Sequence, residues 1–323
     1  MKRFLLERWF LIGMVSLVGI ALMFPGPLAV ASKPLDPRIV IGVALALMAW
    51  TMPTRTLRDE MRSPWGALLA VAVGYLPLPA AGWFLGDLLG PPDDLRVGFL
   101  LACSVPCTLA SCILWTRLAG GNEATALLAV LISTLASPLV VPAWLALTLG
   151  AGIQLPISRM VFDLAATVVL PVLVGQALRR RDAARHFADR HKPMLGAIAQ
   201  LFILATVVRA ASAMGLRLRE EQTLGIAGFA SCAILAAGLH LAALLGGYAA
   251  ARSFGIDRAR AIAVGFCGSQ KTLPVSLALF DQYFKADYPL AMAPLVFFHM
   301  GQLLLDTLVA ERWKRTTAPR SQP

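Results

Sequence analysis

The sequence has little charge and lacks the pattern of a membrane strand. Of its 323 residues, 15% are Asp, Glu, Lys or Arg, against about 25% in a typical soluble domain. Segments in which apolar and polar residues alternate are missing. The composition therefore argues against a soluble globular domain, and the pattern argues against a transmembrane β-barrel.

The sequence is also poor in the groups that build metal centres and active sites. It has four histidines and five cysteines, and the cysteines all lie inside apolar runs: Cys103, Cys107, Cys112, Cys232 and Cys267. No histidine or acid is placed to complete a metal site with them. HExxH and paired carboxylates within apolar runs are absent. We therefore expect no cofactor, no metal centre and no enzymatic activity.

Hydrophobic residues are abundant. They make up 58% of the chain, and the mean hydropathy is +0.71. Because a helix needs roughly 20 apolar residues to cross a bilayer, the sequence predicts an all-α polytopic membrane protein. Ten transmembrane helices are expected, over residues 9–27, 38–53, 65–89, 96–116, 122–148, 158–178, 195–214, 223–251, 259–280 and 288–310.

The basic residues predict the orientation. Of the 29 Lys and Arg residues, 20 lie in flanks that share a side with the N-terminus, 8 lie in the opposite flanks, and Lys271 lies inside a span. Cytoplasmic loops collect Lys and Arg, so both termini are predicted to be cytoplasmic. The same distribution explains the net charge of +11 without nucleic acid, and it suggests contact with anionic membrane lipid.

The first apolar run has two interpretations. Its basic start and Ala29-Val30-Ala31 imitate a cleaved signal peptide. The alternative is a retained first helix, which we favour because the count of ten spans requires it.

The predicted spans divide into two halves of five. Residues 1–178 would hold the first repeat (helices 1–5) and helix 6, residues 179–194 a central cytoplasmic loop, 195–311 helices 7–10, and 312–323 a cytoplasmic tail. An odd number of spans per half inverts the second repeat, an arrangement common in secondary transporters. The repeats would cover about 9–148 and 158–310. The Val-Gly-Phe at residues 97–99 returns at residues 264–266, in the fourth span of each half.

Polar residues and helix breakers gather in spans 4, 5 and 9. Prolines in these spans free backbone groups that must find partners or line a wet cavity. A single hydroxyl bonded to its own helix is the simpler explanation for any one of them. Together, however, they predict a substrate or ion site. The binding residues we expect there are Thr108, Ser111, Cys112, Ser133, Ser269, Gln270 and Lys271, joined from span 10 by His299 and Gln302.

Lys271 is the sharpest feature of this group. A charged residue at mid-membrane costs about 2.5–3.5 kcal/mol on insertion scales, and it usually serves an ion or substrate path. A structural ion pair is the alternative, but Glu123 and Asp306 are expected near span ends, and Asp163 lies in span 6. His240, alone in span 8, is expected to be a satisfied interhelical histidine.

These stretches resemble the bile acid:sodium symporter family, and its SBF-like branch in particular. The resemblance extends over nearly the whole chain and is specific in residues 107–142 and in "FCGSQKTLPVSLALF". It implies two inverted repeats, with a panel domain of helices 1, 2, 6 and 7. The remaining helices would form a core domain in which broken helices 4 and 9 cross. It also implies amphipathic organic anions taken up with sodium.

The family's sodium ligands match this chain only in part. The span 4 Ser-Asn pair falls on Ser111-Cys112, and the hydroxyl ligands of span 5 fall on Ala126 and Val130. The span 9 glutamate falls on Phe266. The resemblance therefore implies a degenerate sodium site near Ser111 and Gln270.

At the family's other ligand positions, the ligand residues are also retained only in part. The span 9 glutamine is retained as Gln270, but the asparagine after it is Lys271. A span 3 glutamine falls near Gly74. The span 10 histidine matches His299, followed by Met300 instead of asparagine. The resemblance thus suggests that the Lys271 ammonium lies about where crossing helices offer carbonyls and Ser111, and takes the place of a sodium ion. Lysine there could then couple to protons or bind an anionic substrate.

We accordingly expect a secondary active transporter for a small or amphipathic organic anion. It would work by alternating access in the plasma membrane, or the inner membrane in a bacterium. Sodium or a proton would be its coupling ion. The alternative is a non-transporting membrane regulator or partner-binding subunit on the same fold. The substrate, the coupling ion and the oligomeric state stay open at this point.

Overall fold

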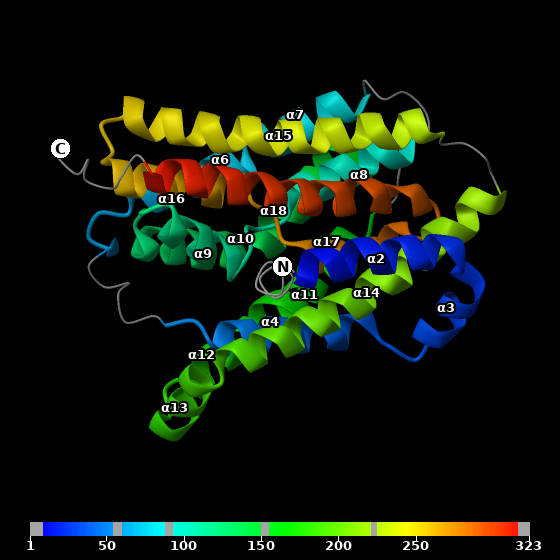
Figure 1. Cartoon of the computed structure of the whole chain (residues 1–323), viewed down its shortest axis with the longest axis horizontal. Coiled ribbons are helices and arrows are strands. Elements are labelled where there is room, and N and C mark those ends of the chain that lie inside the picture. The colour runs from blue at the N-terminus through cyan, green and yellow to red at the C-terminus, as the bar shows by residue number, and fades with distance from the viewer. Residues whose placement is uncertain (1–8, 54–59, 88–92, 150–154, 221–224, 316–323) are drawn as a thin grey trace.

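The computed structural model describes residues 9–53, 60–87, 93–149, 155–220 and 225–315, and these residues form helices joined by short connections without strands. Figure 1 shows the helices lying mostly lengthwise in one elongated bundle. The described part of the chain is therefore all-α, as the hydropathy predicts.

The first half of the chain contains helices that in several places are broken. They are α2 (Trp9–Met23), α3 (Pro25–Ser32), α4 (Pro37–Trp50), α6 (Trp65–Tyr75), α7 (Pro77–Asp87), α8 (Asp93–Ser104), α9 (Ser111–Leu118) and α10 (Glu123–Leu149). Prolines accompany the breaks: Pro77 begins α7, and Pro106 lies between α8 and α9. A proline cannot continue a helical hydrogen-bond ladder, which explains the locations.

The second half has longer helices and two π-helical segments. Its elements are α11 (Ile157–Leu164), η1 (Ala165–Val169), α12 (Leu170–Leu178), α13 (Asp182–Arg190), α14 (Lys192–Glu220), α15 (Ile226–Ser253), α16 (Arg258–Ser269), α17 (Leu273–Leu279), η2 (Phe280–Phe284), η3 (Pro289–Ala291) and α18 (Met292–Arg315). Of these, η1 and η2 are π-helices and η3 is a 3₁₀-helix.

Six helical segments of the described chain are long and apolar enough to cross a membrane: 65–86, 123–149, 157–178, 192–216, 227–253 and 289–314. The pair formed by α2 and α3 raises the number to seven if it counts as one span, and α4 is a shorter apolar helix. The protein is therefore a multi-pass membrane protein. Helices occupy all ten ranges that the sequence predicts, but the broken ones do not each qualify as a crossing.

Two local expectations are wrong. The predicted first span, residues 9–27, runs past a sharp bend, because α3 turns away from α2 by 113° at Phe24. Pro25 begins α3 and forces that turn. Residues 179–194, expected as a loop, include the helix α13 and the start of α14. Hydropathy detects crossing segments but not a polar helix lying outside them.

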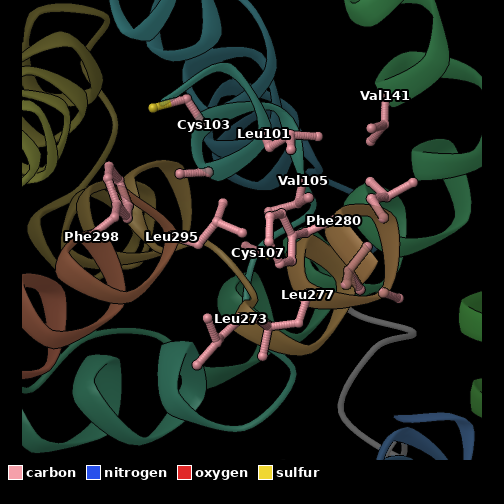
Figure 2. Close-up of a cluster of buried hydrophobic side chains, with 14 of the residues drawn as sticks. Leu101, Cys103, Val105, Cys107, Val141, Leu273, Leu277, Phe280, Leu295 and Phe298 are labelled. Carbon is pink, nitrogen blue, oxygen red and sulfur yellow. The ribbon is translucent and has the colours of Figure 1, made fainter. Parts of the chain in front are cut away.

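The helices pack in two groups. In the α14 group, α2, α3 and α4 contact α14, and α12 packs against α4. In the α16 group, α16 contacts α6, α10 and α15, while α18 contacts α8 and α15. Figure 2 shows side chains from α8, α17 and α18, among them Leu101, Leu277 and Leu295, converging in the buried core where the broken helices meet.

Candidate functional site

The two helix breaks touch each other. The chain leaves helical geometry after Ser104 and again at residues 270–272, where Gln270 and Thr272 are extended. The Thr272 backbone N–H donates to the Pro106 carbonyl at 3.0 Å. A backbone donor of the second break therefore pairs with a carbonyl of the first break. Buried backbone groups that lack helical partners require such hydrogen bonds. The structure thus joins two segments that are far apart in sequence.

Lys271 lies in the second break and is 4% exposed. Its ammonium donates to the Gly74 carbonyl at 2.5 Å and to the Val105 carbonyl at 3.0 Å, and it lies 5.1 Å from the centre of the Tyr75 ring. Gly74 and Val105 lie at the C-terminal ends of α6 and α8, where carbonyls lack helical partners and the helix dipole is negative. The ammonium therefore caps two helices at once, and no described carboxylate forms an ion pair with it.

The glycine at position 74 makes this approach possible. A Cβ atom added there would lie 3.2 Å from the Gly268 carbonyl oxygen and 3.5 Å from the Lys271 Nζ. The contact with the Gly268 carbonyl would be tight, so the absence of a side chain at residue 74 allows α6 and α16 to approach closely beside the ammonium.

Gln270 joins four side chains through its amide. Its Oε1 accepts hydrogen bonds from Thr108 at 2.5 Å, Ser111 at 2.8 Å and the Cys112 thiol at 3.3 Å. Its Nε2 donates to Asp306 Oδ2 at 2.5 Å. The donation to Asp306 on one side and the three donors on the other fix which way the amide points.

These residues do not fit a bound sodium ion. The Ser111 hydroxyl oxygen also lies 2.6 Å from the Thr108 hydroxyl oxygen. The oxygens of Thr108, Ser111 and Gln270 therefore form hydrogen bonds to one another and do not surround a space for an ion. The resemblance suggests that the Lys271 ammonium lies beside Ser111. Among the described residues, however, the hydrogen bonds of the ammonium do not include the Ser111 hydroxyl. The carbonyls that hold the ammonium belong to Gly74 and Val105.

Asp306 is a site residue that sequence reasoning missed. It is fully buried, and its Oδ1 lies 2.8 Å from His240 Nε2. The other nitrogen of His240 lies 3.3 Å from the Ser269 carbonyl. His240 is therefore a satisfied interhelical histidine, as expected, but Asp306 is not near a span end. Its spacing from His299 and Gln302 places all three on one face of α18, a signal that was available in the sequence.

Gln302 holds the backbone of the second break. Its Oε1 accepts from the Lys271 N–H at 2.9 Å, and its Nε2 donates to the Lys271 carbonyl at 3.0 Å. The same Nε2 lies 2.8 Å from His299 Nδ1. An extended residue inside the membrane thus receives from α18 the hydrogen bonds that a helix would otherwise supply.

A cavity of about 340 Å³ lies between the α14 group and the broken helices. Thr108, Ser111 and His299 line it, together with apolar residues of α2 and α4 such as Phe10 and Met48. Charged residues also border it: Arg117, Glu123 and Lys192. These belong to flanks predicted to be cytoplasmic. An apolar cavity with a few polar groups and a charged rim suits an amphipathic solute.

The predicted site residues thus fall into three sets. Thr108, Ser111 and His299 reach the cavity, whereas Cys112, Gln270, Lys271 and Gln302 form a buried layer behind it. Ser133 packs against Cys107 at 3.0 Å beside a small void that Lys271 also lines. The Ser269 hydroxyl bonds to the Phe266 carbonyl of its own helix at 3.3 Å. Neither serine lines the cavity.

The chain is similar in sequence to known membrane transport proteins. Residues 8–315 match the model of the SBF-like CPA transporter family. An uncharacterized protein of Pseudomonas aeruginosa is 32% identical over 77% of this chain and 75% of its own. A probable chloroplastic sodium/metabolite cotransporter of Oryza sativa is 27% identical over 94% and 75%. Sodium/bile acid cotransporter 7 of Danio rerio is 26% identical over 94% and 92%.

The chain therefore belongs to the SBF-like CPA transporter family, within the bile acid:sodium symporters. This is a family of transporters rather than enzymes.

Proposed function

We propose that this protein is a secondary active transporter that moves a small or amphipathic organic anion across the plasma membrane by alternating access. In a bacterium this would be the inner membrane, with both termini in the cytoplasm. The cavity supports the proposal, because it combines apolar residues of α2 and α4 with the hydroxyls of Thr108 and Ser111. The basic side chains of Arg117 and Lys192 also border it. The relatives' names, sodium/bile acid and sodium/metabolite cotransporter, point in the same direction.

We further propose the ten-helix arrangement of two inverted repeats. Helical segments in all ten predicted ranges support it, and so do the matching breaks in α8–α9 and α16–α17. In this arrangement the α14 group is the panel and the α16 group is the core. The cavity then lies between the two domains, where relative movement would expose it to either side.

One observation carries the mechanism: the Lys271 ammonium fills the place between the Gly74 and Val105 carbonyls. By the family resemblance, a glutamine of sodium-coupled relatives falls near Gly74 and an asparagine falls on Lys271. Here a glycine makes room and a lysine supplies a fixed positive charge. We propose that this charge replaces a bound cation, and that transport therefore does not require sodium. Because neither carbonyl lines the cavity, we assign the ammonium to holding the broken helices rather than to binding substrate.

Flux measurements test this proposal. The purified protein would be screened by thermal shift against organic anions, starting with a bile salt. Uptake of the anions that bind would then be measured in proteoliposomes while sodium and pH are varied separately. We expect wild-type uptake to be independent of sodium. Strict sodium dependence without a response to pH would overturn the replacement of sodium by Lys271.

Two Lys271 variants sharpen the test. Lys271→Ala opens a place bordered by free carbonyls, so we expect uptake to fall at least tenfold and the melting temperature to rise with added sodium, because ligands that bind the folded state stabilise it. Lys271→Met keeps the side-chain volume without charge, so it should lose uptake without gaining the response to sodium. Unimpaired uptake by Lys271→Ala would contradict the proposal. Absence of flux with every anion, alongside a stably co-purifying partner, would indicate a non-transporting regulator.

A further inference from the structure

A second polar cluster joins η2 to α3, α11 and α14. On α14, Arg209 Nε donates to Asp281 of η2 at 3.0 Å, and its Nη1 donates to the Ser32 carbonyl at the end of α3 at 3.2 Å. Lys285 also contacts Asp281, at 2.9 Å. One carboxylate of η2 thus attaches the segment after α17 to two elements of the α14 group.

A second carboxylate joins η2 to α11, and here the donors lie in η2 and the acceptor lies outside it. Asp163 of α11 accepts hydrogen bonds from the Tyr283 hydroxyl at 2.5 Å and from the Gln282 amide. Arg159, one turn earlier, lies 3.7 Å from the same carboxylate. The segment η2 therefore receives contacts from α11 and from α14 through separate residues. We name Asp163, Arg209, Asp281, Gln282 and Tyr283 the η2 latch.

Both carboxylates are associated with π-helical turns. Asp281 lies within η2, and Asp163 comes shortly before η1, where its carbonyl accepts the Thr167 hydroxyl at 2.6 Å. Such turns are uncommon, and they occur frequently at functional sites because the extra residue redirects side chains. Here they turn side chains of two different helices toward each other.

The cavity and the latch contact different stretches of α14. Lys192, Gln200 and Ile203 line the cavity, and Arg209 lies beyond them, roughly 9 Å past Ile203 at 1.5 Å per residue. From Lys192, in the first turn, Arg209 is roughly 25 Å away along the helix. That separation approaches the hydrocarbon thickness of a bilayer, about 30 Å. In Figure 1 the two ends of α14 are correspondingly far apart, one near α13 and the other near α3.

We propose that the η2 latch is the gate on the face opposite the cavity mouth. It holds η2 against α11 and α14 while the cavity is open to the other side. The proposal rests on the proposed transport function, because alternating access needs contacts that close one face and can be released. The latch residues are suited to being released, because Asp163, Arg209 and Asp281 are 14%, 22% and 16% exposed. Separating such partly exposed pairs leaves no charge fully buried without a partner, unlike separation of a fully buried pair.

Side-specific labelling tests the gate without relying on transport. A cysteine introduced at Met48, which lines the cavity, would be labelled with a membrane-impermeant maleimide added to either face of reconstituted vesicles. We expect Asp281→Asn and Tyr283→Phe each to lower the labelling rate from the cavity face and raise it from the latch face, by about fivefold or more. Tyr283→Phe removes only the hydroxyl that Asp163 accepts, so its fold should be preserved.

Matched controls separate gating from general damage. Asp189→Asn breaks an ion pair between Arg179 and Asp189 near the start of α14, and it should leave both labelling rates unchanged. Protein with Met48 intact reports any labelling of the five native cysteines, all of which are buried. Unchanged rates in both latch variants, in protein that elutes as wild type does, would overturn the gate. A shift in labelling in a protein that moves no anion would support the gate while refuting transport.

Discussion

Lys271 shows how a single charge is accommodated inside a membrane. Its ammonium has no described carboxylate partner. It binds instead to the carbonyls of Gly74 and Val105, and Gln302 satisfies its backbone. Helix C-termini carry partial negative charge and unpaired acceptors, so two of them together offset much of the cost of burying the charge. The residue therefore ties α6 and α8 to the second break.

We expect Gly74→Ala to disturb this arrangement. The new Cβ would lie 3.2 Å from the Gly268 carbonyl oxygen, a tight contact from which α6 and α16 must move apart slightly, so the free energy of unfolding should fall by about 1–3 kcal/mol, together with uptake. Gly246→Ala on α15 is the matched control, because a Cβ there meets nothing within 4 Å. That control should be neutral or slightly stabilising. Thermal melts in detergent compare the two, and equal stability for both variants would refute the role of Gly74.

At the scale of elements, the broken helices and α13 have different origins. Pro106 follows the end of α8 and Pro274 lies in the first turn of α17, and both prolines are visible in the sequence. The placement of α13 depends on tertiary contacts. Arg179 donates to Asp189 at 2.8 Å and to the Trp50 carbonyl at 2.9 Å, and Phe187 stacks on Trp50 with ring centres 5.7 Å apart. These contacts attach a polar helix, which no hydropathy signal reveals, to the end of α4.

The docking of α13 should weaken in acid. The hydrogen bond from Arg179 lowers the pKa of Asp189 below its ordinary value. A carboxyl with a lowered pKa in the docked state stabilises docking above its free pKa of about 3.9, and that stabilisation is lost as the pH falls through the lowered value. The effect should be small, because Asp189 is half-exposed.

Hydrogen exchange of residues 182–190 measures this effect. We expect more protection near pH 6 than near pH 3 once intrinsic exchange rates are corrected. Asp189→Asn should remove most of the difference, since an amide does not titrate in this range. Equal protection of the wild-type helix at both pH values would show that the ion pair does not control docking.

At the scale of the whole molecule, the proposed transport function implies that the structure is one of two alternating conformations. The cavity is bordered by residues from flanks that the charge count places in the cytoplasm, and the η2 latch joins residues from the opposite flanks. With the proposed function and the predicted orientation, this arrangement corresponds to an inward-open transporter. The orientation itself rests on the 20 basic residues on one side and the 8 on the other.

Reporter fusions test the orientation. A green fluorescent protein joined to the C-terminus should fluoresce when expressed in bacteria, because that reporter folds in the cytoplasm, whereas alkaline phosphatase at the same place should be inactive. The reverse result would place the cavity mouth on the outer face. It would then also exchange the inner and outer assignments of the cavity and the latch.

Much of the fold could be predicted from sequence. Apolar length, prolines and the Lys and Arg distribution are local properties, so they indicated the helical ranges, the breaks at Pro106 and Pro274, and the unusual position of Lys271. The bend at Phe24 and the helix α13 were missed, because one depends on the direction of a turn and the other on docking. Of the predicted site residues, Ser133 and Ser269 do not line the cavity, since helical hydroxyls can equally well bond to their own backbone.

By itself the sequence determined that this protein is a multi-pass helical membrane protein with a charged residue at a helix break. Crossing a lipid bilayer requires long apolar helices, and a proline or a charged residue within such a run can be recognised in the sequence as an interruption. Only the tertiary structure decided what those interruptions mean. It brought Lys271 to Gly74 across 197 residues and Gln270 to Asp306 across 36. Such partners are selected by the packing of distant helices, because buried polar groups must be satisfied by whatever the fold places beside them.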